Sequence, residues 1–164
     1  MEALLNELRQ EAATTKRLLD RVPADKLDWR PHARSMSLGQ LALHVATIPG
    51  GLSQMAQLSE FDATNMNFEP PVPESTAAIM AAFEQSIADA SKYLSALTPA
   101  SAAGEWRLTL RGNEVFRMPR AGLLRSLLLN HWYHHRGQLS VYLRLLDVPV
   151  PVIYGRSADE NPFA

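Results

Sequence analysis

Three histidines fall within five positions of one leucine-rich stretch, LLLNHWYHHRGQLSVYL, which spans residues 127–143. They are His131, His134 and His135. His131 and His135 are four residues apart, so on a helix their rings leave the same face about 5–6 Å from each other at Cβ. That spacing lets two imidazoles bind one metal ion. His134 lies about 100° around the helix from His135 and is poorly aimed.

A heptad pattern predicts that the histidine pair lies in the core seam of its helix. Alternating steps of four and three residues run through Leu124, Leu128, His131, His135, Gln138, Tyr142 and Leu145. The same spacing runs through Leu41, His44, Ile48 and Met55 in an earlier stretch. His44 is therefore the natural third ligand.

Three imidazoles on two facing helices would form a metal site whose fourth position is open for water or substrate, as in catalytic metal centres. The alternative is a set of buried histidines that are satisfied by hydrogen bonds or line a cavity without metal. Burying polar rings without partners costs about 1–3 kcal/mol each, so the agreement of three histidines favours metal. His32 lies in a loop and is expected to be solvated.

The chain contains no cysteine, which excludes disulfides, thiolate ligands and a protein thiol nucleophile. Any metal must therefore be bound through nitrogen and oxygen. Nickel, zinc and iron are all plausible ions, because imidazole suits each of them and three nitrogens do not discriminate.

Charge and hydropathy exclude other classes of protein. The net charge is −1 and no recognition helix is visible, which argues against nucleic-acid binding. Residues 104–144 carry seven arginines against two glutamates, and a solvated rim is favoured over an anion-recognition surface. No apolar run approaches the roughly 20 residues that span a bilayer, and the start EALLNELRQE is too charged for a signal peptide. We expect a soluble, cytoplasmic protein.

The elements that position the histidines are predicted to be four amphipathic helices. The first covers residues 2–22, and the second opens at a Ser37–Gln40 capping box and is expected to kink or stop at Pro49–Gly51. The third covers Glu74–Leu97 and the last, uninterrupted, covers Ala121–Leu146. The proline-rich segment NMNFEPPVPES, residues 65–75, is predicted to be structureless.

Residues 105–119, EWRLTLRGNEVFRMP, alternate in strand fashion and predict a β-hairpin. A three-residue turn at 112–114 is preferred, which pairs Leu110 with Phe116 and Leu108 with Met118. A two-residue turn would instead oppose Leu108 to Arg117. The fold expected is an all-α four-helix bundle with a small β-hairpin before the last helix, in a single domain over residues 1–164.

The segment NHWYHHRGQLSVYLRLLDVPVP, residues 130–151, resembles the DinB/YfiT-like family of four-helix bundles, whose signature is a histidine pair followed by Arg-Gly-Gln on the last long helix. The likeness extends to KLDWRPHARSMS, to MSLGQLALHVATIP and to the ending PVIYGRSADENPF, so it covers nearly the whole chain. It implies an up-down-down-up bundle that binds a divalent metal ion through His44, His131 and His135. It also implies a homodimer, which agrees with more apolar helix face than one seam can bury.

Relatives of this kind include thiol S-transferases that use bacillithiol and maleylpyruvate isomerases that use mycothiol. The resemblance therefore implies a metal-dependent enzyme, most simply a thiol S-transferase-like activity on a small electrophile, in a pocket at one end of the bundle. The metal would activate a low-molecular-weight thiol or water, and a metal-activated hydrolase is a close variant. The alternative is a non-catalytic metal-binding module of the stress response. No general base is assigned; Arg136, Gln138 and Tyr142 lie near the ligands in sequence, and Gln138 is expected at most to orient one of them.

Overall fold

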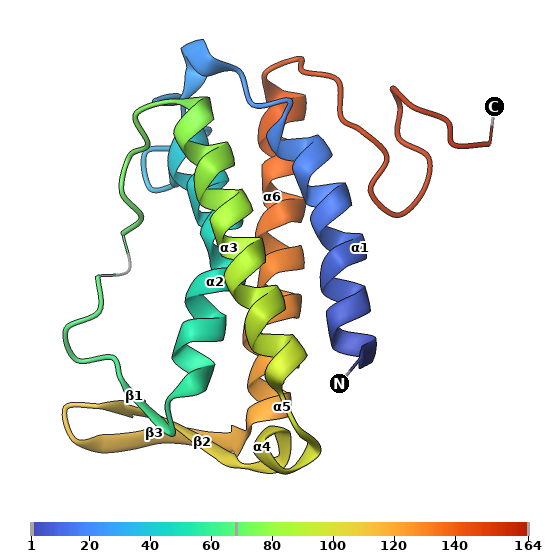
Figure 1. The fold of residues 1–164 in the computed structure, drawn as a ribbon. Coiled ribbons are helices and arrows are strands. Elements are labelled where there is room, and N and C mark those ends of the chain that lie inside the picture. Colours follow the sequence, from blue (N-terminus) through green and yellow to red (C-terminus); the bar gives the residue numbers. More distant parts are fainter. Residues whose placement is uncertain (1, 68, 164) are drawn as a thin grey trace.

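Four long helices pack side by side and form the body of the molecule (Figure 1). The computed structural model describes residues 2–67 and 69–163. The long helices are α1 (Glu2–Leu19), α2 (Leu38–Gln57), α3 (Thr76–Ala96) and α6 (His131–Leu145). Along the chain they run up, down, down and up (Figure 1). Both α1 and α2 contact α3 and α6, so the predicted four-helix bundle is confirmed.

The core lies between these helices, where each contributes one apolar face. Its fully buried side chains include Leu8, Leu18, Leu41, Val45, Ile79, Phe83, Trp132, Leu139 and Leu143. Four helices with one apolar face each can exclude water only by packing those faces together. None of the helices in the described ranges is long and apolar enough to cross a bilayer.

The start of α2 follows the sequence prediction. The backbone N–H of Gln40 donates to the Ser37 hydroxyl over 3.2 Å, and the backbone N–H of Ser37 donates to the Gln40 side chain over 2.9 Å. This is the expected capping box, which satisfies two donors that a helix start leaves free. The predicted kink or stop at Pro49–Gly51 is not a stop, because α2 continues through all three residues to Gln57.

A small sheet closes one end of the bundle (Figure 1). Its strands are β1 (Glu60–Asp62), β2 (Glu105–Leu110) and β3 (Asn113–Pro119), in the order β1-β2-β3. The hairpin of β2 and β3 was predicted, whereas the short parallel strand β1 was not. The helix α4 (Pro99–Ala103), which directly precedes β2, was also missed.

The predicted hairpin register is wrong by two residues, because Leu108 was expected opposite Met118. The turn is formed by two residues, Arg111 and Gly112, which both have positive φ, at 53° and 75°. Two-residue turns of this kind match the right-handed twist of the strands. A bulge on β3 then shifts the pairing, so that Leu108 lies opposite Phe116 and Trp106 opposite Met118. Hence the apolar residues of both strands still share one face.

The last helical stretch has three parts. The first is α5 (Arg120–Leu123), the second is the π-helical segment η2 (Leu124–Asn130), and the third is α6. Together they cover the range that was predicted as one regular helix. The wider π-turn inserts one residue into the helical spacing just before His131, which changes the face of the helix on which the following residues lie.

Candidate metal centre

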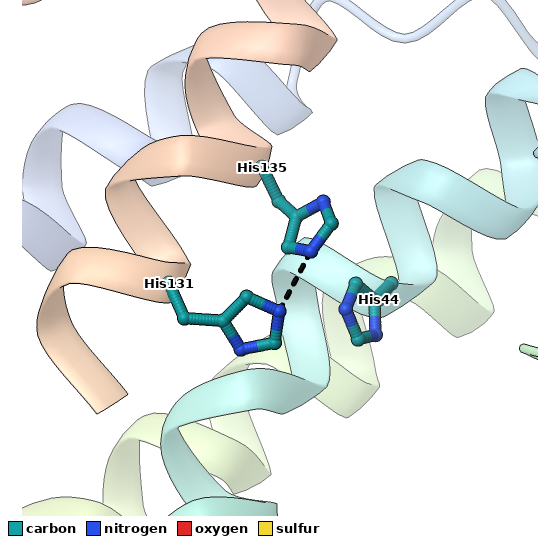
Figure 2. Close-up of side chains that lie close together, drawn as sticks. All are labelled: His44, His131 and His135. Atoms are coloured by element: carbon teal, nitrogen blue, oxygen red, sulfur yellow. Dashed lines mark hydrogen bonds between the residues drawn. The ribbon is translucent and has the colours of Figure 1, made fainter. Parts of the chain in front are cut away.

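Three imidazoles from two helices converge between α2 and α6 (Figure 2). The ring centroid of His44 lies 5.4 Å from that of His131 and 4.5 Å from that of His135. The Nε2 atoms of His131 and His135 are 2.7 Å apart. One ring nitrogen of each residue lies within 4.8 Å of the other two, and within the described residues this is the single group of three such side chains.

This donor set fits a divalent ion. Three nitrogens bound to a tetrahedral ion at roughly 2.0–2.1 Å lie about 3.3 Å from one another. Small side-chain rotations bring separations between 2.7 Å and 4.8 Å to that value. Three protein ligands also leave a coordination position for water or substrate. The structure thus brings together the three residues that the sequence pattern singled out, and they could hold a metal ion.

Burial favours the neutral imidazole, which is the form that binds metal. Loss of hydration, assisted by repulsion from His131, lowers the pKa of His44 to about 4. Burial, assisted chiefly by His44, also lowers the pKa of His135 to about 4, against the opposing effect of its hydrogen bond to Gln138. The pKa of His131 is lowered as well, mainly by burial. Near pH 7 a metal ion would therefore displace no proton from these rings.

Gln138 orients one of the candidate ligands. Its side-chain oxygen Oε1 lies 2.7 Å from Nδ1 of His135. A carbonyl oxygen can only accept, so Nδ1 of the neutral ring must carry the proton and Nε2 is left with a free lone pair. That Nε2 is the nitrogen that faces His131. The role expected of Gln138, as a residue that orients a ligand, agrees with this geometry.

The π-turn places the histidine pair beside the core seam. The predicted seam through residues 124, 128, 131, 135, 138, 142 and 145 is wrong after Leu128. Beyond η2 the buried positions of α6 are Trp132, Arg136, Leu139 and Leu143, each one residue later than predicted. His131 and His135 are therefore half-buried at the edge of the core, where a small molecule can reach them.

A proline on α2 fixes how that helix meets α6. Pro49 has no N–H, so the carbonyl of Val45 lacks its usual partner one turn later. The indole Nε1–H of Trp132 donates to this carbonyl over 2.9 Å. Val45 follows His44 and Trp132 follows His131, so this bond joins the two helices beside the candidate ligands. α2 therefore stays continuous at Pro49 while α6 satisfies the freed carbonyl.

The histidines open into a cavity of about 490 Å³, referred to below as the triad cavity. Its remaining walls come from Met36, Leu43, Thr47, Met66, Asn67, Glu69, Pro70 and Pro71. Residues 66–67 and 69–71, predicted only as part of a structureless linker, thus form one wall of the site. Gln40 ties it down, because its side-chain amide donates to the carbonyl of Pro70 over 2.9 Å. The triad cavity therefore lies between α2, α6 and these loop residues.

The other residues considered from the sequence lie outside the triad. His32 is exposed, as expected, and His134 is exposed and lies outside the triad. Arg136 is buried against α1, where it forms an ion pair with Glu11. Tyr142 donates a hydrogen bond to the backbone carbonyl of Met36 over 3.2 Å. Arg136 and Tyr142 therefore hold helix and loop contacts.

The fold and site define a class of protein: an up-down-down-up helical bundle with three histidines, on its second and last long helices, that could hold a divalent ion. The model of the DinB family matches residues 1–161, so the chain belongs to the DinB family.

Individual relatives agree with this assignment. The chain is 27% identical over 163 residues to YrdA, an uncharacterized protein of Bacillus subtilis (strain 168). The matched region covers 98% of this chain and 91% of YrdA. A DinB-like protein from Bacillus cereus ATCC 10987 superposes with a TM-score of 0.72 at 24% identity, over 94% of this chain and 97% of that one. The DinB-like protein YjoA from Bacillus subtilis gives a TM-score of 0.71 at 18% identity, over 94% and 99% of the two chains. At these identities the two structures support the fold.

Proposed function

We propose that this protein is a metal-dependent enzyme in which His44, His131 and His135 hold one divalent ion. In the proposed reaction a small thiol attacks a small electrophile and displaces its leaving group. In the variant reaction water takes the place of the thiol and the electrophile is hydrolysed. The observation that supports this proposal is the convergence of three neutral imidazoles on a cavity large enough for a small molecule. When bound there, a divalent ion would lower the pKa of a thiol or water molecule toward neutrality.

The side chains around the triad fit this chemistry. Gln138 holds His135 with Nε2 toward the shared point. Met36, Leu43 and Met66 supply apolar walls against which an electrophile can pack. The chain has no cysteine, so the sulfur of a thiol transfer must arrive on a small molecule. Nickel, zinc and iron all suit three imidazoles, so the donor set leaves the choice among them to metal analysis.

Metal analysis of two histidine variants tests the metal site. His135→Ala removes a ligand and leaves two, so the purified variant should lose its metal. His134→Ala removes an exposed ring outside the triad, so metal content should remain near one ion per chain. Elemental analysis measures the metal content of both variants, after circular dichroism has shown that each is folded. If the ion survives each single replacement in the triad at full occupancy, the site lies elsewhere.

Turnover separates the enzyme from the non-catalytic alternative. The metal-loaded protein should consume a chromogenic aryl halide in the presence of a small thiol, or hydrolyse an activated ester, and His135→Ala should do neither. Metal bound at full occupancy without turnover of any thiol or ester would favour a metal-binding module without catalysis.

A further inference from the structure

A second cavity of about 390 Å³ adjoins the triad cavity and is referred to below as the arginine cavity. Its lining includes Arg30 and Arg34, both from the loop between α1 and α2. The two cavities share three wall residues, Met36, Glu69 and Pro70. A ligand that reaches over this shared wall can therefore contact the arginine loop at one end and the histidines at the other.

The two arginines differ from most others in the chain because they have no partner within the described residues. Other guanidinium groups are held by carboxylates in the pairs Arg17–Glu160, Arg107–Glu60, Arg117–Glu114, Arg125–Glu7, Arg136–Glu11 and Arg144–Asp159. Arg120 donates to the backbone carbonyls of Ala56, Ser101 and Leu58. Arg30 and Arg34 are both exposed and line one cavity with guanidinium groups that no acceptor in the described residues engages.

Hydrogen bonds fix the loop that carries the arginines. The N–H of Leu38 donates to the carbonyl of Trp29 over 2.7 Å, and the N–H of Ser35 donates to the carbonyl of His32 over 2.9 Å. The Tyr142 hydroxyl donates to the carbonyl of Met36 at the far end of the loop. The backbone that carries Arg30 and Arg34 is therefore held by the fold before any ligand binds, which reduces the entropy lost in ordering this loop on binding.

Glu69 lines both cavities, and the charges beside it differ between the two. It is the only carboxylate among the residues that line the triad cavity, and it stands on the shared wall. Its negative charge opposes an anionic group in either cavity, and only the arginine cavity has positive side chains, those of Arg30 and Arg34, to offset it. Arginine also matches the planar geometry of a carboxylate through paired N–H donors.

We propose that the arginine cavity binds the carboxylate of a small ligand whose thiol end reaches the histidine triad. The inference rests on the proposed function and names its substrate class, an anionic thiol. Arg30 and Arg34 are then specificity-determining residues: they select the thiol that the triad receives, and they have no part in the triad itself.

Binding of matched thiols to the cobalt-loaded protein tests this assignment. The probes are mercaptopropionate, mercaptohexanoate and mercaptooctanoate, each compared with its uncharged methyl ester. Thiolate binding to cobalt gives a charge-transfer absorption in the near ultraviolet, so affinity is read without turnover. At least one acid should bind about fivefold or more tightly than its ester, and the best chain length reports the span between the cavities.

Two double variants assign the preference to the arginine cavity. Arg30→Gln with Arg34→Gln should remove the advantage of the acid and leave the ester unchanged. Arg9→Gln with Arg156→Gln makes the same change in net charge at residues that line neither cavity, and the advantage should persist.

Three results would overturn the inference. They are acids that bind no better than esters at every chain length, a preference that survives loss of Arg30 and Arg34, and a preference that the control pair also abolishes. In each of these cases cobalt binding still supports the proposed function. Failure of the protein to bind cobalt overturns the proposed function and this inference together.

Discussion

At the scale of single residues, the two nitrogens of His135 have different neighbours. Nδ1 faces the side-chain oxygen of Gln138 at 2.7 Å, and Nε2 faces His131 at the same distance. The ring can neither rotate nor exchange its tautomer without breaking the contact to Gln138. A ligand held in this way is ready for a metal ion before the ion arrives.

Gln138→Leu should therefore weaken metal binding while all three histidines remain. Loss of the acceptor frees the tautomer and orientation of His135, and changes of this kind lower metal affinity about 10- to 100-fold. Gln138→Glu keeps an acceptor at the same place and should retain most of the affinity. Competition titration with a chromogenic chelator measures both. Equal affinity in the leucine variant and the parent would show that Gln138 does not orient the ring.

Two of the three candidate ligands, His131 and His135, were predictable because their relation to each other is local. Residues three and four apart share a helix face, which links His131, His135 and Gln138 by spacing alone. The wall formed by residues 66–67 and 69–71 gave no such signal, since its place beside the histidines depends on Gln40, which is 30 positions from Pro70. Arg30 and Arg34 were equally invisible as a pair, because their lack of partners is a property of the folded chain.

At the scale of elements, the π-turn is the feature that sequence spacing could not supply. The heptad pattern predicts the buried positions correctly at Leu124 and Leu128. Beyond them the buried positions lie one residue later than predicted, because η2 is wider than an α-helical turn. Leucines in the stretch LRSLLLN fit either spacing, so apolar pattern alone does not locate the insertion. The same insertion moves Trp132 into the core and the histidines to its edge.

The bond between Trp132 and Val45 predicts coupling between Trp132 and Pro49. Trp132→Phe leaves a buried carbonyl without a donor and removes part of a buried ring, which should lower the free energy of unfolding by about 2–4 kcal/mol. Pro49→Ala restores a backbone N–H one turn after Val45. In that background the tryptophan change should cost about 1 kcal/mol less.

Urea denaturation of the two single variants and the double variant measures this coupling. Trp106→Phe is the matched control, because its indole donates to the carbonyl of Met55, away from Pro49. The effects of Trp106→Phe and Pro49→Ala should add. Additive effects for Trp132→Phe and Pro49→Ala as well would contradict the proposed replacement of one donor by the other.

At the scale of the whole molecule, the homodimer stays a prediction. Val141 and Leu145 are one turn apart on α6 and are each 57% exposed, so this helix retains an apolar outer strip. Light scattering at micromolar concentration should give twice the chain mass of 18.2 kDa. Val141→Glu should reduce it to the chain mass if this strip forms the contact. A parent protein that scatters as a single chain refutes the dimer.

The final prediction concerns a polar network that joins the first helix, the last helix and the C-terminal segment. Arg136 is 1% exposed and pairs with Glu11 at 2.5 Å. It also donates to the Thr15 hydroxyl at 3.1 Å and to the Tyr154 hydroxyl at 2.5 Å. The rings of Tyr133 and Tyr154 lie 5.1 Å and 5.0 Å from its guanidinium carbon. One buried cation thus fastens three parts of the chain that are far apart in sequence.

Glu11→Gln should lower the free energy of unfolding by about 3–5 kcal/mol, because it leaves the buried charge of Arg136 without its counterion. Glu114→Gln makes the same substitution beside Arg117, whose side chain is 55% exposed, and should change stability within the error of the measurement, because water and salt already screen that pair. Urea denaturation of the two variants compares them directly. Equal losses would mean that Arg136 is reached by solvent in the folded protein, while a large loss confined to Glu11→Gln would identify the ion pair between α1 and α6 as the contact that holds these three parts together.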